Sequence, residues 1–229
     1  DILNIDKFRE WRKEYKNAEF ILNEDKKYVC GSEVEKMSKS KYNVQTPDQL
    51  VEKFGADTLR LYEMFLGPLE QFKPWDTKGI NGVHNFLRKF WRLVHDNENN
   101  FSVSQEPANR DNLKTIHKTI KKVEEDISRY SFNTVVSTLM ICINELTDQN
   151  CKNKEIISDF TILLSPYAPH IAEEIWRKLG NRESIVNTAF PKHKEDFLKE
   201  KSINYPISFN GKMRYKISLD VDVSKEEIE

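Results

Sequence analysis

The sequence predicts a mainly α fold: an antiparallel helical bundle, preceded by a small α/β segment and followed by the start of a small α+β unit. Three observations support this fold class. Apolar residues recur every three or four positions through most of residues 46–180. Charged residues make up 32% of the 229 residues and glycine occurs only seven times, which is typical of amphipathic helices with solvated faces. Strand-like patterns are limited to the two ends of the chain.

The beginning of the chain combines helical and strand-like patterns. Aromatic residues three and four positions apart, from Phe8 to Tyr15, predict a short helix. Two apolar stretches, 20–22 and 28–30, flank Asn23-Glu24-Asp25 and predict a β-hairpin. A polar, lysine-rich loop follows over residues 35–43.

Two helices and an irregular linker are predicted over the next 34 residues. Thr46 is a favourable N-cap, and Pro47 is a favourable first helical residue. Gly55 ends this first helix. A second helix, 56–66, stops at Gly67, which is followed by proline.

Five further helices are predicted from apolar residues at helical spacing, over residues 80–95, 111–129, 132–148, 154–164 and 169–179. Their connections are short, which favours antiparallel neighbours in a bundle. Within them we expect Trp91, Trp176 and Cys142 to be core residues and His170 to be structural or to cap a helix.

The last 30 residues have a different pattern. Apolar and polar residues alternate on both sides of Asn210-Gly211, which is a strong hairpin signal. Ser224 and Glu227 then have the spacing of a helix capping box immediately before the sequence stops. The sequence also begins with Asp1 instead of methionine. We therefore expect that the chain was cut from a longer protein.

Composition narrows the class of protein. The net charge is −1, so contact with nucleic acid requires local basic patches. The three cysteines form no C-x-x-C pair and have no histidine cluster beside them, so we expect no metal site and a reducing compartment. No apolar run is long enough to cross a bilayer, and the start is not a signal peptide. We expect a cytoplasmic monomer without a membrane partner.

The pentapeptide Lys36-Met37-Ser38-Lys39-Ser40 is the most informative motif. Two lysines three positions apart can direct two compact cations at one polyphosphate. The serines can donate hydrogen bonds, and the loop can neutralise charge on a leaving pyrophosphate. The alternative is a solvated surface loop. The complete pentapeptide, followed by a helix start at Thr46-Pro47, favours phosphate binding.

This pentapeptide resembles the signature loop of class I aminoacyl-tRNA synthetases. Residues 35–44 and 55–60 are similar to the subgroup specific for leucine, isoleucine, valine and methionine. Residues 62–70 and 73–75 resemble the leucyl-tRNA synthetases specifically. Further resemblance to leucyl enzymes lies in residues 165–176, 210–216 and 224–229. The resemblance covers almost the whole chain.

The resemblance implies an enzyme that activates leucine with ATP and Mg²⁺ and transfers it to tRNA(Leu). Lys36 and Lys39 would be catalytic, and Met37, Ser38 and Ser40 would bind ATP with them. The implied segments are the end of the catalytic domain (1–45), stem-contact helices and a linker (46–79), a tRNA-binding helical bundle (80–199) and a truncated C-terminal α+β domain (200–229). The second class I signature, His-x-Gly-His, is not in the sequence, so this piece is expected to be inactive alone.

Two basic lines on predicted helices are candidates for tRNA contact. The first contains Arg88, Lys89 and Arg92, with His84 and His95 at the same helical spacing. The second contains Lys114, Lys118 and Lys121. The alternative is that both lines are ordinary charged helix faces.

Two other functions remain open. The enzyme could instead be an isoleucyl, valyl or methionyl synthetase, against which the stretch 67–75 argues. The chain could also be a helical RNA-binding module without catalysis, against which the Lys36–Ser40 loop argues.

Overall fold

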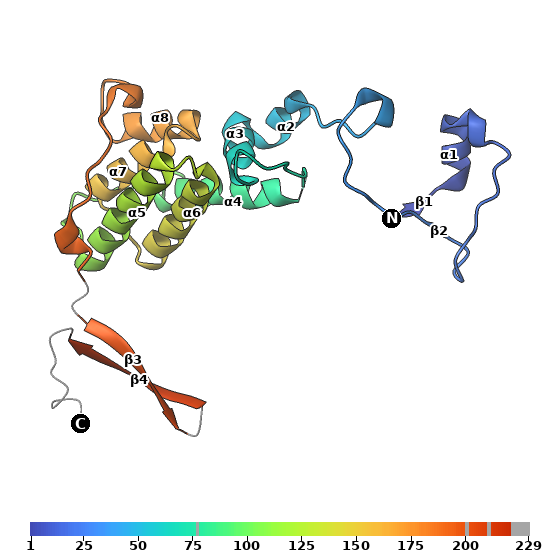
Figure 1. Cartoon of the computed structure of the whole chain (residues 1–229). Helices are drawn as coiled ribbons and strands as arrows, with labels where there is room; N and C mark the ends of the chain where they lie inside the picture. Colours follow the sequence, from blue (N-terminus) through green and yellow to red (C-terminus); the bar gives the residue numbers. More distant parts are fainter. Residues whose placement is uncertain (77, 200–201, 210–211, 221–229) are drawn as a thin grey trace. The chain divides into compact units, whose positions relative to one another are not determined.

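The structure, a computed structural model, describes residues 1–76, 78–199, 202–209 and 212–220 (Figure 1). It consists of two units, Asp1–Gln45 and Thr46–Glu229. Helices dominate the second unit, and strands occur only as two short antiparallel pairs among the described residues. The predicted mainly α fold is therefore confirmed.

The first unit contains β1 (Ile2–Leu3), α1 (Ile5–Trp11), the 3₁₀ helix η1 (Lys13–Tyr15), β2 (Tyr28–Val29) and the 3₁₀ helix η2 (Lys39–Lys41). The Asn4 side chain caps α1 by accepting from the backbone N–H of Lys7 at 3.1 Å. Strand β1 pairs antiparallel with β2, with Ile2 opposite Val29.

The predicted hairpin between residues 20–22 and 28–30 is wrong, although its turn forms. The backbone N–H of Asn23 donates to the Lys27 carbonyl at 3.0 Å, which closes the turn. Ile21 and Leu22 are exposed, so this stretch has no buried face to hold a strand in register. Strand β2 pairs instead with the start of the chain.

The second unit contains the helices α2 (Pro47–Phe54), α3 (Ala56–Phe65), α4 (Gly79–Leu93), α5 (Arg110–Ser128), α6 (Phe132–Asp148), α7 (Lys154–Leu164) and α8 (Pro169–Lys178). Each lies within two residues of its predicted range. Gly55 joins α2 to α3 with φ of 85°, a conformation that glycine adopts without steric cost.

The hydrophobic core lies between antiparallel helices (Figure 1). Helix α5 packs along α6, α6 packs on α3 and α4, and α7 packs on α5 and α8. The fully buried Phe160 of α7 contacts the rings of Phe86 and Phe90 of α4, with centroids 6.5 and 4.8 Å away. Burial of such large side chains stabilises the bundle by about 2–3 kcal/mol each.

The predicted core residues are confirmed, with one qualification for the tryptophans. Cys142 is buried, and burial raises the pKa of its thiol to about 12. Trp91 and Trp176 pack against the core but remain partly exposed. Their indole N–H groups donate to the Asn99 side chain and the Glu183 carbonyl, at 2.8 and 3.1 Å.

Asp57 of α3 caps the beginning of α8. Its carboxylate accepts from the backbone N–H groups of His170 and Ile171, at 3.2 and 2.7 Å, and lies 2.7 Å from the His170 Nδ1 atom. Helix α8 receives no bond from its own N-cap side chain. The His170 ring thus contacts the carboxylate that caps α8, which agrees with the structural role expected for this residue.

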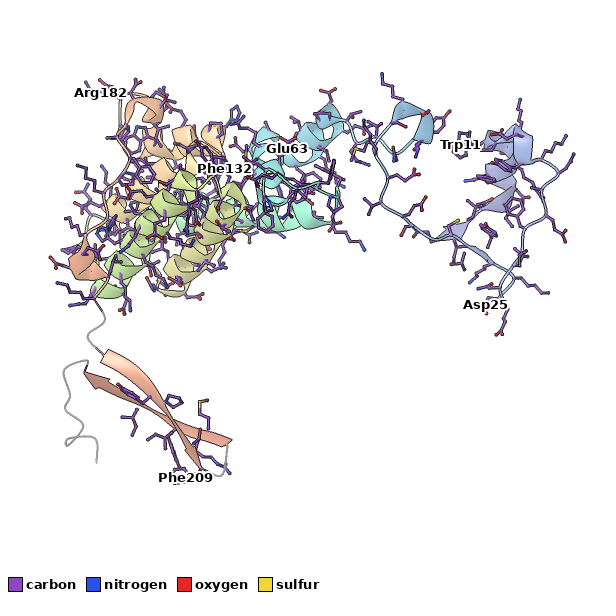
Figure 2. The ribbon with its side chains drawn as sticks, in the orientation of Figure 1. Trp11, Asp25, Glu63, Phe132, Arg182 and Phe209 are labelled. Atoms are coloured by element: carbon purple, nitrogen blue, oxygen red, sulfur yellow. The ribbon has the colours of Figure 1, made fainter. Side chains whose placement is uncertain are left out.

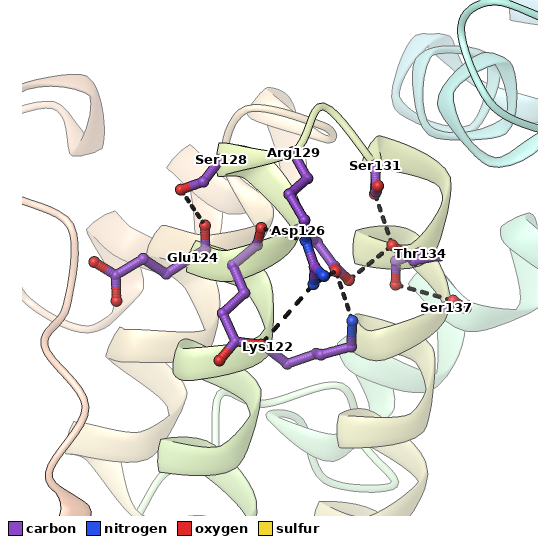
Figure 3. A network of polar contacts seen from close by, with 9 residues as sticks. Lys122, Glu124, Asp126, Ser128, Arg129, Ser131, Thr134 and Ser137 are labelled. Atoms are coloured by element: carbon purple, nitrogen blue, oxygen red, sulfur yellow. Dashed lines mark hydrogen bonds and ion pairs between the residues drawn. The ribbon is translucent and has the colours of Figure 1, made fainter.

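Asp126 organises the turn between α5 and α6 (Figure 3). Its buried carboxylate accepts from Lys122 Nζ at 2.5 Å, Arg129 Nη2 at 3.2 Å and Thr134 Oγ1 at 2.7 Å. Desolvation raises the pKa of this carboxyl group, but the bonds from Lys122 and Thr134 and the charges of Lys122 and Arg129 outweigh it. The net pKa is below its ordinary value.

The pKa of Asp159, in α7, is shifted in the opposite direction to that of Asp126. Burial, and then the negative charge of Glu155, raise its pKa to about 6, although Lys194 acts against the shift. The folded state therefore binds this proton more tightly than the unfolded state, and the fold loses stability as the pH rises from about 4 to about 6.

We expect Asp159→Asn to stabilise the chain at pH 7.5 by about 1–2 kcal/mol. The gain is expected to shrink as the pH falls from about 6 to about 4, because in this range the folded wild-type chain binds a proton at Asp159 that the unfolded chain does not bind. Urea unfolding at pH 7.5 and pH 4 measures both values. A stability difference that is independent of pH would contradict the assigned pKa.

The segment after α8 returns to α5 before the final strands. It contains the 3₁₀ helices η3 (Ile185–Asn187) and η4 (Glu195–Phe197). The Phe197 ring stacks on the His117 ring of α5, with centroids 4.8 Å apart. Burial lowers the pKa of His117, with smaller contributions from the positive charges of Lys194 and His193. The neutral form of the imidazole that stacks on the Phe197 ring is thus favoured.

Strands β3 (Ser202–Phe209) and β4 (Lys212–Asp220) form the predicted antiparallel hairpin. Phe209 pairs with Lys212, and these two residues flank the Asn210-Gly211 loop that the sequence predicts. That loop and the predicted capping box at Ser224 and Glu227 lie outside the described residues. In the part of the chain that is described, none of the helices has the length and apolar character needed to cross a bilayer.

Candidate functional site

The Lys36–Ser40 segment leads into a tight turn in the first unit, the 3₁₀ helix η2. Ser38 is extended, with φ of −152° and ψ of 150°, and it precedes η2. The backbone N–H groups of Lys41 and Tyr42 donate to the carbonyls of Ser38 and Lys39, both at 3.2 Å. Tyr42 ends the turn in the left-handed conformation, with φ of 55°. The chain therefore reverses direction directly after the second lysine of the motif.

The two serines of the motif lie together. The Ser38 and Ser40 hydroxyl oxygens are 3.1 Å apart. The backbone N–H of Ser38 donates to the Asn43 side-chain oxygen at 2.8 Å. Ser38 is half-buried, whereas Met37 and Ser40 are exposed. The hydroxyl pair therefore lies at the surface of the turn, where a phosphate oxygen can reach it.

The lysines of the loop differ in their surroundings. Lys41 forms an ion pair with Glu35 at 2.7 Å. Lys36 and Lys39 are exposed, and neither has an ion-pair partner among the described residues. The turn thus presents two unneutralised ammonium groups beside two hydroxyl groups, a donor set that fits phosphate oxygens. The catalytic and ATP-binding roles of these residues stay predictions.

The first basic line lies along a cavity between α4 and the end of α6. The cavity has a volume of about 500 Å³ and is lined by Asn85, Arg88, Lys89, Arg92, Leu93, Thr147, Asn150 and Lys152. Lys89 Nζ donates to the Asn144 side chain of α6 at 2.6 Å. Arg88 and Arg92 are exposed and have no ion-pair partner in the described part of the chain. The fold therefore brings all three predicted cations to one concave surface.

Neither of the two histidines near this line is part of the cavity lining. His84 Nδ1 lies 3.2 Å from the Thr58 hydroxyl. His95 is buried and stacks on the Trp91 ring, with centroids 3.9 Å apart. Helix α4 ends at Leu93, so His95 no longer follows the helical spacing of the arginines. The helical spacing therefore holds for His84, which lies within α4, but not for His95.

The second basic line borders a groove between α5 and α6. Lys114, Lys118 and Lys121 line this cavity of about 540 Å³ together with Thr138 and Ile141 of α6. Lys121 Nζ bonds to the Glu195 carboxylate at 2.8 Å. This hydrogen bond, and then the charge of Glu195, raise the pKa of Lys121. An RNA phosphate at Lys121 would therefore compete with a carboxylate of the same chain.

Helix α6 separates the two basic lines. Its Asn144 contacts Lys89 of α4, and its Glu145 accepts from the Thr115 hydroxyl of α5 at 3.1 Å. The two cavities share no lining residue, so the two lines do not form a single continuous patch.

Sequence reasoning missed Lys152 and Asn150 of the first cavity. Both lie in the short connection between α6 and α7, outside any helical repeat. Asn150 has φ of 51°, and the backbone N–H of Cys151 returns to the Leu146 carbonyl at 2.9 Å. This turn at the end of α6 brings Lys152 to the α4 arginines. In the sequence, the only signal of such a turn is Asn150, an asparagine that follows a long helix.

Two family profiles match the sequence. The family described as the anticodon-binding domain of tRNA ligase matches residues 109–229. The family described as tRNA synthetases class I (I, L, M and V) matches residues 25–71 and so includes the lysine loop.

Curated relatives match over the whole chain. A leucine–tRNA ligase of Christiangramia forsetii is 60% identical over 229 residues, which are 100% of this chain and 24% of that protein. The leucine–tRNA ligases of Cytophaga hutchinsonii and Porphyromonas gingivalis are 57% and 52% identical, again over 100% of this chain and 25% and 24% of theirs. The chain thus spans about a quarter of the length of these relatives.

A solved structure shares the fold. It is a LeuRS of Agrobacterium radiobacter K84 in a ternary complex with tRNA and LeuAMS. The TM-score is 0.64 at 24% identity, with 84% of this chain and 27% of that chain covered.

Proposed function

Because the chain belongs to the family of tRNA-ligase anticodon-binding domains, we propose that it is part of a leucine–tRNA ligase. The observation that carries the proposal is the similarity to such ligases along the entire chain. The enzyme would join leucine to ATP and transfer the leucyl group to tRNA(Leu). We place it in the cytoplasm as a monomer.

The Lys36–Ser40 turn would act in the first step. The leucine carboxylate attacks the α-phosphorus of ATP, which forms leucyl adenylate and breaks the bond to pyrophosphate. Lys36 and Lys39 would neutralise the charge that develops on the departing pyrophosphate. Ser38 and Ser40, whose hydroxyl oxygens are 3.1 Å apart, would donate to its oxygens.

Mg²⁺ would enter this step with ATP. The groups of the turn are ammonium and hydroxyl donors, which fit phosphate oxygens and not a metal ion. Bound to ATP, Mg²⁺ supplies additional positive charge on the same phosphates. Lys36 and Lys39 would supply the protein's own positive charge to the same polyphosphate.

The sequence contains no His-x-Gly-His motif. We therefore propose that these 229 residues do not activate leucine by themselves. Aminoacylation by the protein expressed from its complete gene tests the proposed function. We expect leucine to be esterified to tRNA(Leu) and not to other tRNAs. A folded protein that charges tRNA with a different amino acid would refute the leucine assignment.

The helical bundle would bind tRNA through the first basic line. Arg88, Lys89 and Arg92 converge on one cavity with Lys152, so several phosphates can be neutralised together. The second line is the weaker candidate, because Lys121 is already paired with Glu195.

Replacing Arg92 by alanine is expected to weaken tRNA(Leu) binding by the 229-residue chain by about 5–10-fold and to reduce the slope of log K against log salt by about 1. Filter binding at several salt concentrations measures both quantities. Arg182→Ala is the matched control, because this exposed arginine follows α8 and does not line the cavity (Figure 2). Equal loss in both variants would mean that binding depends only on total charge.

A further inference from the structure

The Lys36–Ser40 turn depends on a side chain just outside the motif. Asn43 is half-buried and lies three residues after Ser40. Its Oδ1 atom accepts from the Ser38 backbone N–H at 2.8 Å, and its Nδ2 atom donates to the Lys36 carbonyl at 3.4 Å. The first contact is a good hydrogen bond and the second is long. One amide therefore contacts the backbone on both sides of Met37.

The backbone before Asn43 explains how this contact arises. Tyr42 has φ of 55° and ψ of 27°, so the chain reverses and directs Asn43 back toward Ser38. The Tyr42 ring packs edge-on against Trp11, which is labelled in Figure 2, with centroids 5.1 Å apart. The Arg12 guanidinium carbon lies 4.9 Å from the Trp11 ring and 6.0 Å from the Tyr42 ring. These aromatic contacts hold the unusual conformation of Tyr42 in place.

We propose that Asn43 is a positioning residue, which holds the turn that carries Lys36 and Lys39 in its working conformation. This inference rests on the proposed function of the loop. Asn43 does not touch the substrate; it acts by fixing the backbone from Lys36 to Ser38, from which the first lysine and the first serine project. A preorganised cation stabilises a transition state better than a mobile one, because no ordering is needed when charge develops.

ATP–pyrophosphate exchange by the protein expressed from its complete gene tests the proposal. We expect Asn43→Ala to lower kcat by about 10-fold while the KM for ATP changes by less than about 3-fold. Asn23→Ala is the matched control, since Asn23 Oδ1 also accepts a backbone N–H at 2.8 Å in the same unit, in a turn outside the motif. Its exchange rate is expected to stay within about 2-fold of the unsubstituted protein.

A double substitution separates positioning from general damage. If Asn43 acts by positioning Lys36, whose carbonyl it contacts, Lys36→Ala/Asn43→Ala will be within about 3-fold of Lys36→Ala alone. A loss in the double variant equal to the product of the two single losses would overturn the proposal. An unchanged kcat in Asn43→Ala, with exchange strongly reduced in Lys39→Ala, would overturn it as well. Full exchange by Lys39→Ala would instead overturn the proposed function of the loop, and this inference with it.

Discussion

Lys39→Ala is expected to reduce leucine-dependent ATP–pyrophosphate exchange by about 10²–10³-fold in the protein expressed from its complete gene. The reason is that Lys39 presents an exposed ammonium group without an ion-pair partner in the described chain, directly in the turn. Its charge is available to a departing pyrophosphate. The loss is expected mainly in kcat, since the negative charge to be neutralised develops in the transition state.

Lys41→Ala is the control for this effect. Lys41 belongs to the same turn, but its ammonium group already pairs with Glu35 at 2.7 Å. Exposed ion pairs contribute little to stability, so the turn is expected to persist and exchange to fall by less than about 3-fold. Equal losses in both variants would show that the loop contributes only its overall charge.

Asp126→Asn is expected to lower the free energy of unfolding of the chain by about 3 kcal/mol at pH 7. The buried carboxylate accepts bonds from Lys122, Arg129 and Thr134, and an amide cannot replace its charge. The pKa of Asp126 is lowered in the folded state, so its contribution is complete above the unfolded pKa and is lost as the pH falls through the folded pKa. The difference between the two proteins should therefore shrink below about pH 4.

Urea unfolding at pH 7 and pH 3 measures this difference. Glu63→Gln provides the control, because Glu63 is an exposed carboxylate on α3 and the same chemical change there is expected to alter stability by less than about 0.5 kcal/mol. A loss for Asp126→Asn that is as large at pH 3 as at pH 7 would mean that packing, and not the charge, supports the turn.

The sequence predicted the helices well because their signal is local. Apolar residues at helical spacing, together with Gly55 and Pro169, place the helices of the second unit to within two residues. Which segment pairs with a two-residue strand depends instead on competition between segments that are far apart in the sequence. The turn at Asn23 was predicted, but strand β2 pairs with Ile2 at the start of the chain. No local pattern distinguishes these partners.

The candidate site was predictable to a similar extent. The loop and the arginines of α4 are evident as sequence patterns, and the fold places Arg88 and Arg92 on one cavity. Contacts between segments far apart in sequence were not evident. Lys152 joins the arginines only because the turn after α6 reverses the chain, and Glu195 neutralises Lys121 from 74 residues away.

Exchange of pyrophosphate into ATP with leucine, isoleucine, valine and methionine, one at a time, tests the central claim most directly. The account predicts that leucine supports exchange with a kcat/KM at least about 100-fold above the others in the protein expressed from its complete gene. Strongest exchange with isoleucine, valine or methionine would contradict the leucine assignment. No exchange with any of the four, from a folded protein, would contradict the catalytic role of the Lys36–Ser40 loop.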